Sequence, residues 1–306
     1  MQLDERLMQE RQGYFHVGSE QQTPVWSGAA TAEPGVLVRA PRKRVLGTAR
    51  RVLCCIVPHD GHMSIVVAVL LLIPVVVFLS SVVPSDDVVS FVVVPVFTLF
   101  ALLCLLCAVT VDPGVLVPIP PDPSRQAQIV EINGAQFECK ICTTCNIVRP
   151  PRSSHCRQCD WCVDEYDHHC GVLGSCVAKR TFRFFSGFIA FSVVLAAYIF
   201  VRCVIFLVAM DFSRESNSDG GRWKLVATFG CALYCMLGGC CVSGQCGFYM
   251  YLGCSNQTQK ECNKTTEGLL HGPPNPFSEG PIINFMKRFF GGLGPSRISS
   301  DTPEFV

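Results

Sequence analysis

The chain has 306 residues, of which 49% are hydrophobic and only 16% are charged. A soluble domain usually carries about 25% charged residues, so this composition argues against an ordinary soluble protein and favours a membrane protein. The formal net charge of +1 points to neither a nucleic-acid partner nor an acidic one, and we expect no nucleic acid to bind.

Residues 1–60 are polar and mixed, and they predict a partly disordered cytosolic segment with a short surface helix over residues 45–57. This segment lacks the early apolar core of a secretory signal peptide. A basic cluster alone is often a solvated face or a nucleic-acid patch, but beside a membrane span it marks the cytosolic side and contacts anionic lipid. The cluster before the first apolar run consists of Arg39, Arg42, Lys43, Arg44, Arg50 and Arg51.

Four apolar runs follow, at residues 63–83, 88–111, 185–210 and 225–252. A helix needs about 20 residues to cross a hydrocarbon core roughly 30 Å thick. The runs contain many β-branched residues, but their length and their lack of alternation favour spanning helices over strands. The sequence therefore predicts an α-helical integral membrane protein, with a helical hairpin over residues 63–111 and a second pair of helices over residues 185–252.

The charges around these runs predict their orientation. The loop at residues 84–87 has no basic residue, whereas residues 112–183 carry eight. By the positive-inside rule, both termini and the stretch between the second and third helices lie in the cytosol. The sequons at Asn256 and Asn263 then stay unglycosylated. Arg202, inside the third run, either faces a polar cavity or snorkels toward the end of the span at Asp211.

The chain has 20 cysteines, and eight of them lie between Cys139 and Cys176 with histidines among them. Disulfide-rich secreted chains are small and less apolar, so the pattern favours metal binding in a reducing compartment. The repeated C-x-x-C spacing suits tetrahedral zinc, which takes four sulfur or nitrogen ligands. Eight cysteines and three histidines make eleven candidate ligands, enough for two sites with three residues left over. Spacing alone does not divide the ligands between the sites.

The stretch DEYDHHC at residues 164–170 leaves two interpretations open. If Cys170 lies outside the zinc sites, a neighbouring histidine and aspartate can make it a nucleophile, because the thiolate is the reactive species. Alternatively, the four residues from Asp167 to Cys170 form only a turn that carries metal ligands. The residues alone do not decide between these interpretations.

Residues 142–170 have the sequence CTTCNIVRPPRSSHCRQCDWCVDEYDHHC. This run resembles, without a gap, the signature of the DHHC protein S-acyltransferases, the palmitoyltransferase family. The resemblance extends over roughly residues 50–290. Further segments that resemble family motifs are Asp112-Pro113-Gly114, KRTFRFF at residues 179–185, and Asn275-Pro276-Phe277 with Gly280 and Asn284.

The resemblance implies a role for each residue of the segment. Catalysis would fall to Cys170 as the nucleophile, His168 as the general base and Asp167 as the carboxylate that orients the base. One zinc would take Cys142, Cys145, His155 and Cys162, and the other would take Cys156, Cys159, His169 and Cys176. Cys139 matches no ligand position.

The family plan implies four transmembrane helices, with a cytosolic cysteine-rich domain that binds two zinc ions at residues 112–184, between helices 2 and 3. A cytosolic C-terminal segment would occupy residues 253–306. The implied activity moves a fatty acyl group, such as palmitoyl, from acyl-CoA to Cys170 and then to a cysteine of another protein. An apolar cavity between the helices would hold the chain, and Lys179 and Arg183 are candidates for contacts with the CoA phosphates.

The implied partners are palmitoyl-CoA or another fatty acyl-CoA, membrane lipid, and cytosolic or peripheral proteins that carry the acceptor cysteine. The implied location is an endomembrane of the Golgi or endoplasmic reticulum, or the plasma membrane. The motif is most similar to the Ras-type subgroup, some members of which need an accessory subunit, so an accessory subunit is a further candidate partner.

The chain departs from the family pattern at two places. Gly171-Val172 replaces the usual Pro-Trp after the nucleophile, and Gln259 replaces the second threonine of a T-T-x-E motif that supports the catalytic aspartate. An active acyltransferase is the favoured interpretation, and a catalytically weak or inactive zinc-stabilised membrane adaptor is the alternative. A transporter or channel is disfavoured because Arg202 is the single charged residue within the spans.

Overall fold

The computed structural model describes residues 50–52, 55–57, 61–210, 218–264 and 275–298. The N-terminal segment at residues 1–60 lies almost wholly outside the described residues, and the C-terminal segment lies partly outside them. Near the first helix, β1 (Arg50–Val52) pairs antiparallel with β2 (Cys55–Val57). The surface helix expected over residues 45–57 is therefore wrong where the structure describes it. Valine and isoleucine recur in this stretch, and β-branched residues favour strands.

Four helices among the described residues are long and apolar enough to cross a membrane, with 21, 23, 28 and 37 residues. This finding confirms the four predicted spans as long apolar helices, although the fourth begins earlier than its apolar run. The helices are α2 (His62–Val77), which continues as a π-helix η1 (Phe78–Val82), α3 (Val88–Thr110), α4 (Phe182–Ala209) and α6 (Asp219–Ser255).

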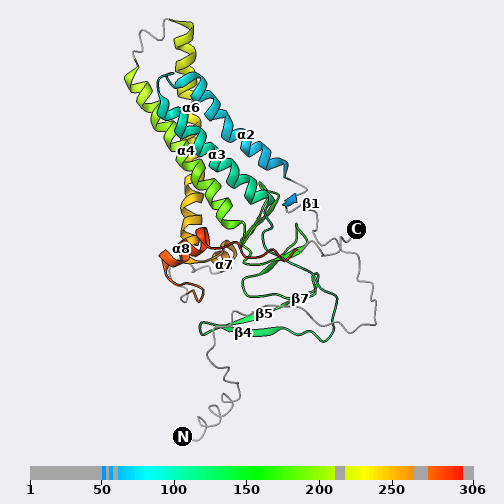
Figure 1. Cartoon of the computed structure of the whole chain (residues 1–306). Coiled ribbons are helices and arrows are strands. Elements are labelled where there is room, and N and C mark those ends of the chain that lie inside the picture. The colour runs from blue at the N-terminus through cyan, green and yellow to red at the C-terminus, as the bar shows by residue number, and fades with distance from the viewer. Residues whose placement is uncertain (1–49, 53–54, 58–60, 211–217, 265–274, 299–306) are drawn as a thin grey trace, which may run out of the picture. The chain divides into compact units, whose positions relative to one another are not determined.

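The four helices run side by side, and α4 packs against both α3 and α6 (Figure 1). Small residues let α6 approach α4 closely: a Cβ added at Gly239 would lie 3.5 Å from the Cβ of Ala196.

The proline in α2 allows a hydrogen bond between that helix and α6. Pro74 cannot donate to the carbonyl of Leu70 in the preceding turn, and the hydroxyl of Tyr234 on α6 donates to that carbonyl instead, at 2.8 Å.

Arg202 on α4 forms an ion pair with Asp87. Asp87 caps the N-terminus of α3, where its side chain accepts from the backbone N–H of Ser90 at 3.2 Å. The Ser90 hydroxyl donates to the second carboxylate oxygen at 2.7 Å and lies 3.0 Å from the hydroxyl of Tyr198. The guanidinium therefore has a partner in the loop between the first two spans, which neither of the two interpretations of Arg202 had named.

Between α3 and α4 the chain forms a set of short antiparallel strand pairs. β3 (Val115–Leu116), β9 (Trp161–Val163) and β8 (Ser154–Cys156) make a three-stranded sheet. The two-stranded pairs are β4 (Gln128–Ile132) with β5 (Ala135–Cys139), β6 (Ile141–Cys142) with β7 (Ile147–Val148), and β10 (His168–Cys170) with β11 (Ser175–Val177). We call residues 112–181 the strand module.

Two short helices follow α6 and pack beside the strand module. α7 (Gln259–Lys264) begins with a capping box, in which Thr258 Oγ1 accepts from Glu261 N at 3.2 Å and Glu261 Oε2 accepts from Thr258 N at 2.8 Å. α8 (Pro281–Phe290) is held to the end of α6 by buried Asn284, which donates to the carbonyl of Cys254 at 2.8 Å. The segment after α6 also contacts the loop that carries Asp167, because the backbone N–H of Gln259 donates to the Asp167 carboxylate at 2.7 Å.

Candidate active site

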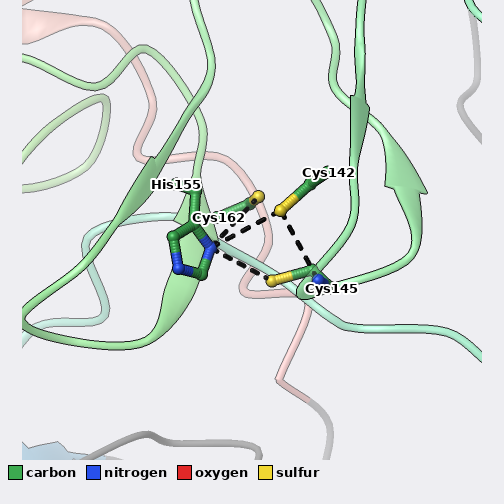
Figure 2. Close-up of side chains that lie close together, drawn as sticks. All are labelled: Cys142, Cys145, His155 and Cys162. Atoms are coloured by element: carbon green, nitrogen blue, oxygen red, sulfur yellow. Dashed lines mark hydrogen bonds between the residues drawn. The ribbon is translucent and has the colours of Figure 1, made fainter.

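Two groups of four cysteine and histidine side chains converge in the strand module, with all donor atoms of each group within 4.8 Å of one another. They are the two groups that the resemblance implies. In the first group, Nδ1 of His155 lies 3.6 Å from Cys142 Sγ, 3.4 Å from Cys145 Sγ and 3.9 Å from Cys162 Sγ (Figure 2). Behind the ring, Nε2 of His155 is 3.5 Å from a carboxylate oxygen of Asp160.

In the second group, Nδ1 of His169 lies 3.5 Å from Cys156 Sγ, 3.3 Å from Cys159 Sγ and 3.8 Å from Cys176 Sγ. The two sulfurs of Cys159 and Cys176 are 3.6 Å apart. Zinc bonds of about 2.3 Å to sulfur and 2.0–2.1 Å to nitrogen would put tetrahedral donors roughly 3.5–3.8 Å apart. The residues in both groups therefore fit a tetrahedral zinc ion, and adjacent His155 and Cys156 on β8 join the two groups.

The adjacent histidines point to opposite sides because β10 is a strand. Successive side chains of a strand alternate between its faces. His169 faces the second cysteine group, while its neighbours His168 and Cys170 share the other face of β10. Pairing with β11 fixes this register, since His169 lies opposite Cys176. A one-residue shift would exchange the two histidines.

Asp167, His168 and Cys170 form a connected chain of polar groups. A carboxylate oxygen of buried Asp167 is 2.8 Å from Nδ1 of His168, which leaves Nε2 of the ring for the thiol of Cys170. Burial lowers the pKa of His168, but the bonds to Asp167 and Cys170 outweigh burial and raise it to about 9. Burial also raises the pKa of Cys170, whereas the bond to His168 and the backbone N–H groups of residues 172 and 173 bring it below its usual value.

The other carboxylate oxygen of Asp167 accepts from the backbone N–H of Gln259 at 2.7 Å. The sequence raised the concern that replacing the second threonine by Gln259 would leave the aspartate unsupported. In the structure the main chain provides a donor, so both oxygens of Asp167 have partners. The glutamine side chain instead accepts from the hydroxyl of Tyr249 at 3.1 Å. Sequence reasoning did not assign Tyr249, because no motif surrounds it.

Tyr249 also holds the histidine ring in place. Its ring stacks on His168 with centroids 6.0 Å apart, and it meets Phe185 edge-to-face at 4.9 Å. Phe185 makes a second edge contact with His168 at 5.4 Å. The imidazole is therefore confined by two aromatic rings and oriented by one carboxylate, which leaves it one direction in which to exchange a proton.

A cavity of about 560 Å³ opens beside Cys170 and runs between α2, α4 and α6. On α4 it extends from Phe185 to Ile199, which at 1.5 Å per helical residue is a depth of about 21 Å. Its far end is lined by Pro74, Ile199 and Cys235, and most of its wall is apolar. Val172 lines the mouth and is 38% exposed. A Cβ added at Gly171 would meet no atom within 4 Å, so there is open space at this position, where the usual Pro-Trp is missing.

A second, more polar pocket of about 690 Å³ lies on the side of the site that faces the strand module. His168, Asp167 and Gln259 line this pocket, and Arg157 and Lys260 supply positive charge to its wall. The two cations suggested from the sequence as phosphate contacts are engaged elsewhere. Lys179 pairs with Asp164 at 3.2 Å and with Glu165 at 3.3 Å, and Arg183 donates to the carbonyl of Gly291.

Together these features define a class of protein. Its helices are long enough to cross a membrane and enclose a deep apolar cavity, and a thiol beside a histidine lies at the mouth of that cavity. The thiol is carried by a module with two groups of cysteines and histidines that could hold metal ions. Residues 135–266 match the family model described as DHHC palmitoyltransferase. The chain therefore belongs to the DHHC palmitoyltransferase family, as its cysteine-rich motif predicted.

Curated relatives agree with this assignment. The chain is 32% identical over 220 residues to "Probable protein S-acyltransferase 6" of Arabidopsis thaliana, covering 66% of this chain and 53% of the relative. It is 33% identical over 232 residues to "Palmitoyltransferase ZDHHC18" of Mus musculus, covering 68% and 60%. With "Palmitoyltransferase ZDHHC14" of Homo sapiens the identity is 35% over 191 residues, covering 60% and 38%. The chain thus spans between about two fifths and three fifths of the length of these relatives.

Proposed function

We propose that this protein is a protein S-acyltransferase, which transfers a fatty acyl group from acyl-CoA to Cys170 and from there to a cysteine of a substrate protein. The observation that carries the proposal is the place of the thiol. Cys170 shares one face of β10 with His168, which is paired with Asp167, and both residues line the apolar cavity between the helices where it reaches the polar surface. The names of the relatives, which are protein S-acyltransferases and palmitoyltransferases, support the same reaction.

In the proposed reaction, His168 takes the proton of the Cys170 thiol and holds it on Nε2, while Asp167 stabilises the resulting imidazolium. The thiolate attacks the thioester carbonyl, the bond from carbon to the CoA sulfur breaks, and the proton passes from His168 to the departing CoA thiolate. The thiol of a substrate protein then attacks the acyl carbon, and the bond between that carbon and the sulfur of Cys170 breaks. His168 accepts the proton of that thiol and returns it to the sulfur of Cys170.

The cavity would hold the acyl chain during both steps. Its depth of about 21 Å along α4 is close to the length of an extended sixteen-carbon chain, about 20 Å, which supports palmitoyl as the preferred group. The polar pocket beside His168 would take the CoA head group, with Arg157 and Lys260 near its phosphates. We place the phosphate contacts there rather than at Lys179 and Arg183, because Arg157 and Lys260 line the polar pocket, whereas Lys179 and Arg183 are not among its lining residues.

Two zinc ions complete the proposal, one in each cysteine group. Bound zinc would supply structural stability, because its binding free energy adds to the folding free energy of a module whose strands are only two to five residues long. We further propose that residues 1–60, 112–184 and 253–306 lie in the cytosol, with residues 63–111 and 185–252 in an endomembrane or the plasma membrane. The basic residues of the strand module support this orientation.

A second candidate, the inactive adaptor, was motivated by the missing tryptophan and the missing threonine. The backbone donor from Gln259 removes one of these motives. The transporter hypothesis was disfavoured because Arg202 is the single charged residue within the spans, and Arg202 pairs with Asp87 and is not among the residues that line the apolar cavity. We therefore propose an experiment for the acyltransferase hypothesis alone.

The test is incubation of the purified full chain with an acyl-CoA carrying a labelled acyl group, followed by hydroxylamine, which cleaves thioesters. Wild type should take up label that hydroxylamine releases, and Cys170→Ser should take up none. Cys139→Ser is the matched control, because Cys139 is a buried cysteine of the same module outside both metal groups, and it should label like wild type. A wild type that stays unlabelled, or a Cys170→Ser variant that labels equally, would refute the proposal.

A further inference from the structure

Few polar side chains reach the cavity wall near Cys170, and Gln259 is one of them. The cavity mouth is lined by His168, Cys170, Tyr249 and Gln259, and its wall then becomes largely apolar toward Ile199. Gln259 lies at the start of α7 and is held there at two points. Its backbone N–H donates to Asp167 at 2.7 Å, and its side-chain oxygen accepts from Tyr249 at 3.1 Å.

These two hydrogen bonds fix the orientation of the Gln259 carboxamide. A glutamine side chain has one acceptor oxygen and an NH₂ group with two donors. Because Oε1 takes the Tyr249 hydroxyl, Nε2 is the part of the carboxamide that remains for the cavity. Tyr249 is itself fixed by its edge contact with Phe185 at 4.9 Å and its stacking on His168. The position of the Gln259 carboxamide is therefore fixed by Tyr249, which is itself buried against Phe185.

The proposed reaction needs such a donor. When the thiolate of Cys170 attacks, the electron pair of the carbonyl π bond moves onto oxygen and forms an oxyanion, which collapses as the bond to the CoA sulfur breaks. Preorganised donors aimed at such an oxygen in a water-poor site usually make a large contribution to the rate. His168 is paired with Asp167 and is occupied with the proton of the thiol, so the oxyanion needs a donor from another residue.

We infer that Gln259 is a catalytic residue of this protein, whose Nε2 donates a hydrogen bond to the oxyanion formed from the thioester carbonyl. The inference rests on the proposed acyl-transfer function and adds a role for a residue that departs from the family motif. The same donor serves the second step, in which the substrate thiol attacks the acyl group on Cys170 and the oxygen again becomes negative.

The experiment compares Gln259→Met and Gln259→Glu with wild type in single-turnover acylation of Cys170 by palmitoyl-CoA. Methionine keeps the length of the side chain without a polar group. Glutamate keeps an acceptor for Tyr249 but, ionised well above the ordinary pKa of a carboxyl group, has no donor. Both variants should acylate on the order of 10²-fold more slowly, while the palmitoyl-CoA concentration for half-maximal rate changes by less than about twofold.

The matched control is Gln136→Met, the same substitution at an exposed glutamine of β5, which should keep the wild-type rate. Zinc content and melting temperature, measured on every variant, identify any that fail to fold. A folded Gln259→Met or Gln259→Glu variant with a near wild-type rate overturns the inference. So does a variant that keeps the maximal rate but needs much more palmitoyl-CoA, since Gln259 would then only bind the ground state. If wild type itself takes no label, the proposed function fails instead.

Discussion

The guanidinium of Arg152 donates hydrogen bonds to both carboxylate oxygens of Glu261, at 2.9 and 3.0 Å. The first residue belongs to the strand module and the second to the short helix after α6, 109 residues later. Arg152 also donates to the carbonyl of Asn256 at 2.8 Å and lies over the ring of Phe277, with 4.6 Å from its central carbon to the ring centroid. One buried side chain thus joins the metal-type module to the segment that supports Asp167.

Replacing Arg152 by Met should strongly destabilise the protein. The Arg152 side chain is 6% exposed, and its loss removes the guanidinium that bonds to both carboxylate oxygens of Glu261. Breaking a buried ion pair by removing one partner costs about 3–5 kcal/mol. Thermal unfolding in detergent should show a lower melting temperature for Arg152→Met than for Arg149→Met, a control on the same module. Equal melting temperatures would contradict the structural role of this pair.

Removing one ligand of the first cysteine group should lower the zinc content. Cys162→Ala leaves three donors where tetrahedral zinc needs four, and the short strands around the site have little else to order them. Elemental analysis of the purified variant should give fewer than two zinc ions per chain. Cys139→Ala removes a buried cysteine outside both groups, and it should keep the zinc content of wild type. Full zinc content in Cys162→Ala would refute the ligand set.

The pair between Asp87 and Arg202 predicts a stability effect without a catalytic one. Asp87→Asn keeps an oxygen to cap α3 but removes the charge that faces Arg202. Since both side chains are partly exposed, we expect a loss of roughly 1 kcal/mol, seen as a lower melting temperature. The acylation rate of the folded protein should stay unchanged, because the pair lies outside the lining of the cavity. A rate that falls with unchanged melting temperature would contradict this.

A larger residue at the far end of the cavity should shorten the preferred acyl chain. Ile199 lines that end and is 1% exposed, so Ile199→Phe fills space that the last carbons of palmitoyl would occupy. Each CH₂ group excluded from the cavity loses about 0.8 kcal/mol of binding. In a competition among acyl-CoAs of different length, the preference should move from sixteen toward fourteen carbons or fewer. Val201→Phe adds the same ring to an exposed position of α4 and should leave the preference unchanged.

Restoring a large ring at the cavity mouth should tighten acyl-CoA binding. Val172 is half-exposed at the mouth, and no side chain extends from Gly171 beside it. Val172→Trp would cover apolar surface of the bound chain worth roughly 1 kcal/mol, or about a fivefold lower KM for palmitoyl-CoA. Steady-state acylation at varied palmitoyl-CoA measures this. An unchanged or higher KM would mean that the missing tryptophan is not what limits binding here.

Much of this protein could be predicted from local sequence. The lengths of the apolar runs predicted the four long helices, because a run of about 20 apolar residues suits only a span. The C-x-x-C spacings predicted metal-type groups, since a thiolate pair three residues apart can converge through one turn. The pattern around Asp167 and Cys170 predicted the family, although the residues alone left open whether they were catalytic or metal-binding.

The tertiary structure decided what depends on contacts between distant parts of the chain. The pairing of β10 with β11 separates His168 from His169, because a strand sends neighbouring side chains to opposite faces. Arg202 pairs with Asp87, which lies 115 residues earlier in the sequence, and Asp167 accepts a hydrogen bond from the backbone of Gln259, 92 residues later. No local periodicity encodes such pairs, since they form only when packed helices and strands bring their ends together. The sequence by itself determined which chemical groups this protein carries, and the packing determined which of them meet.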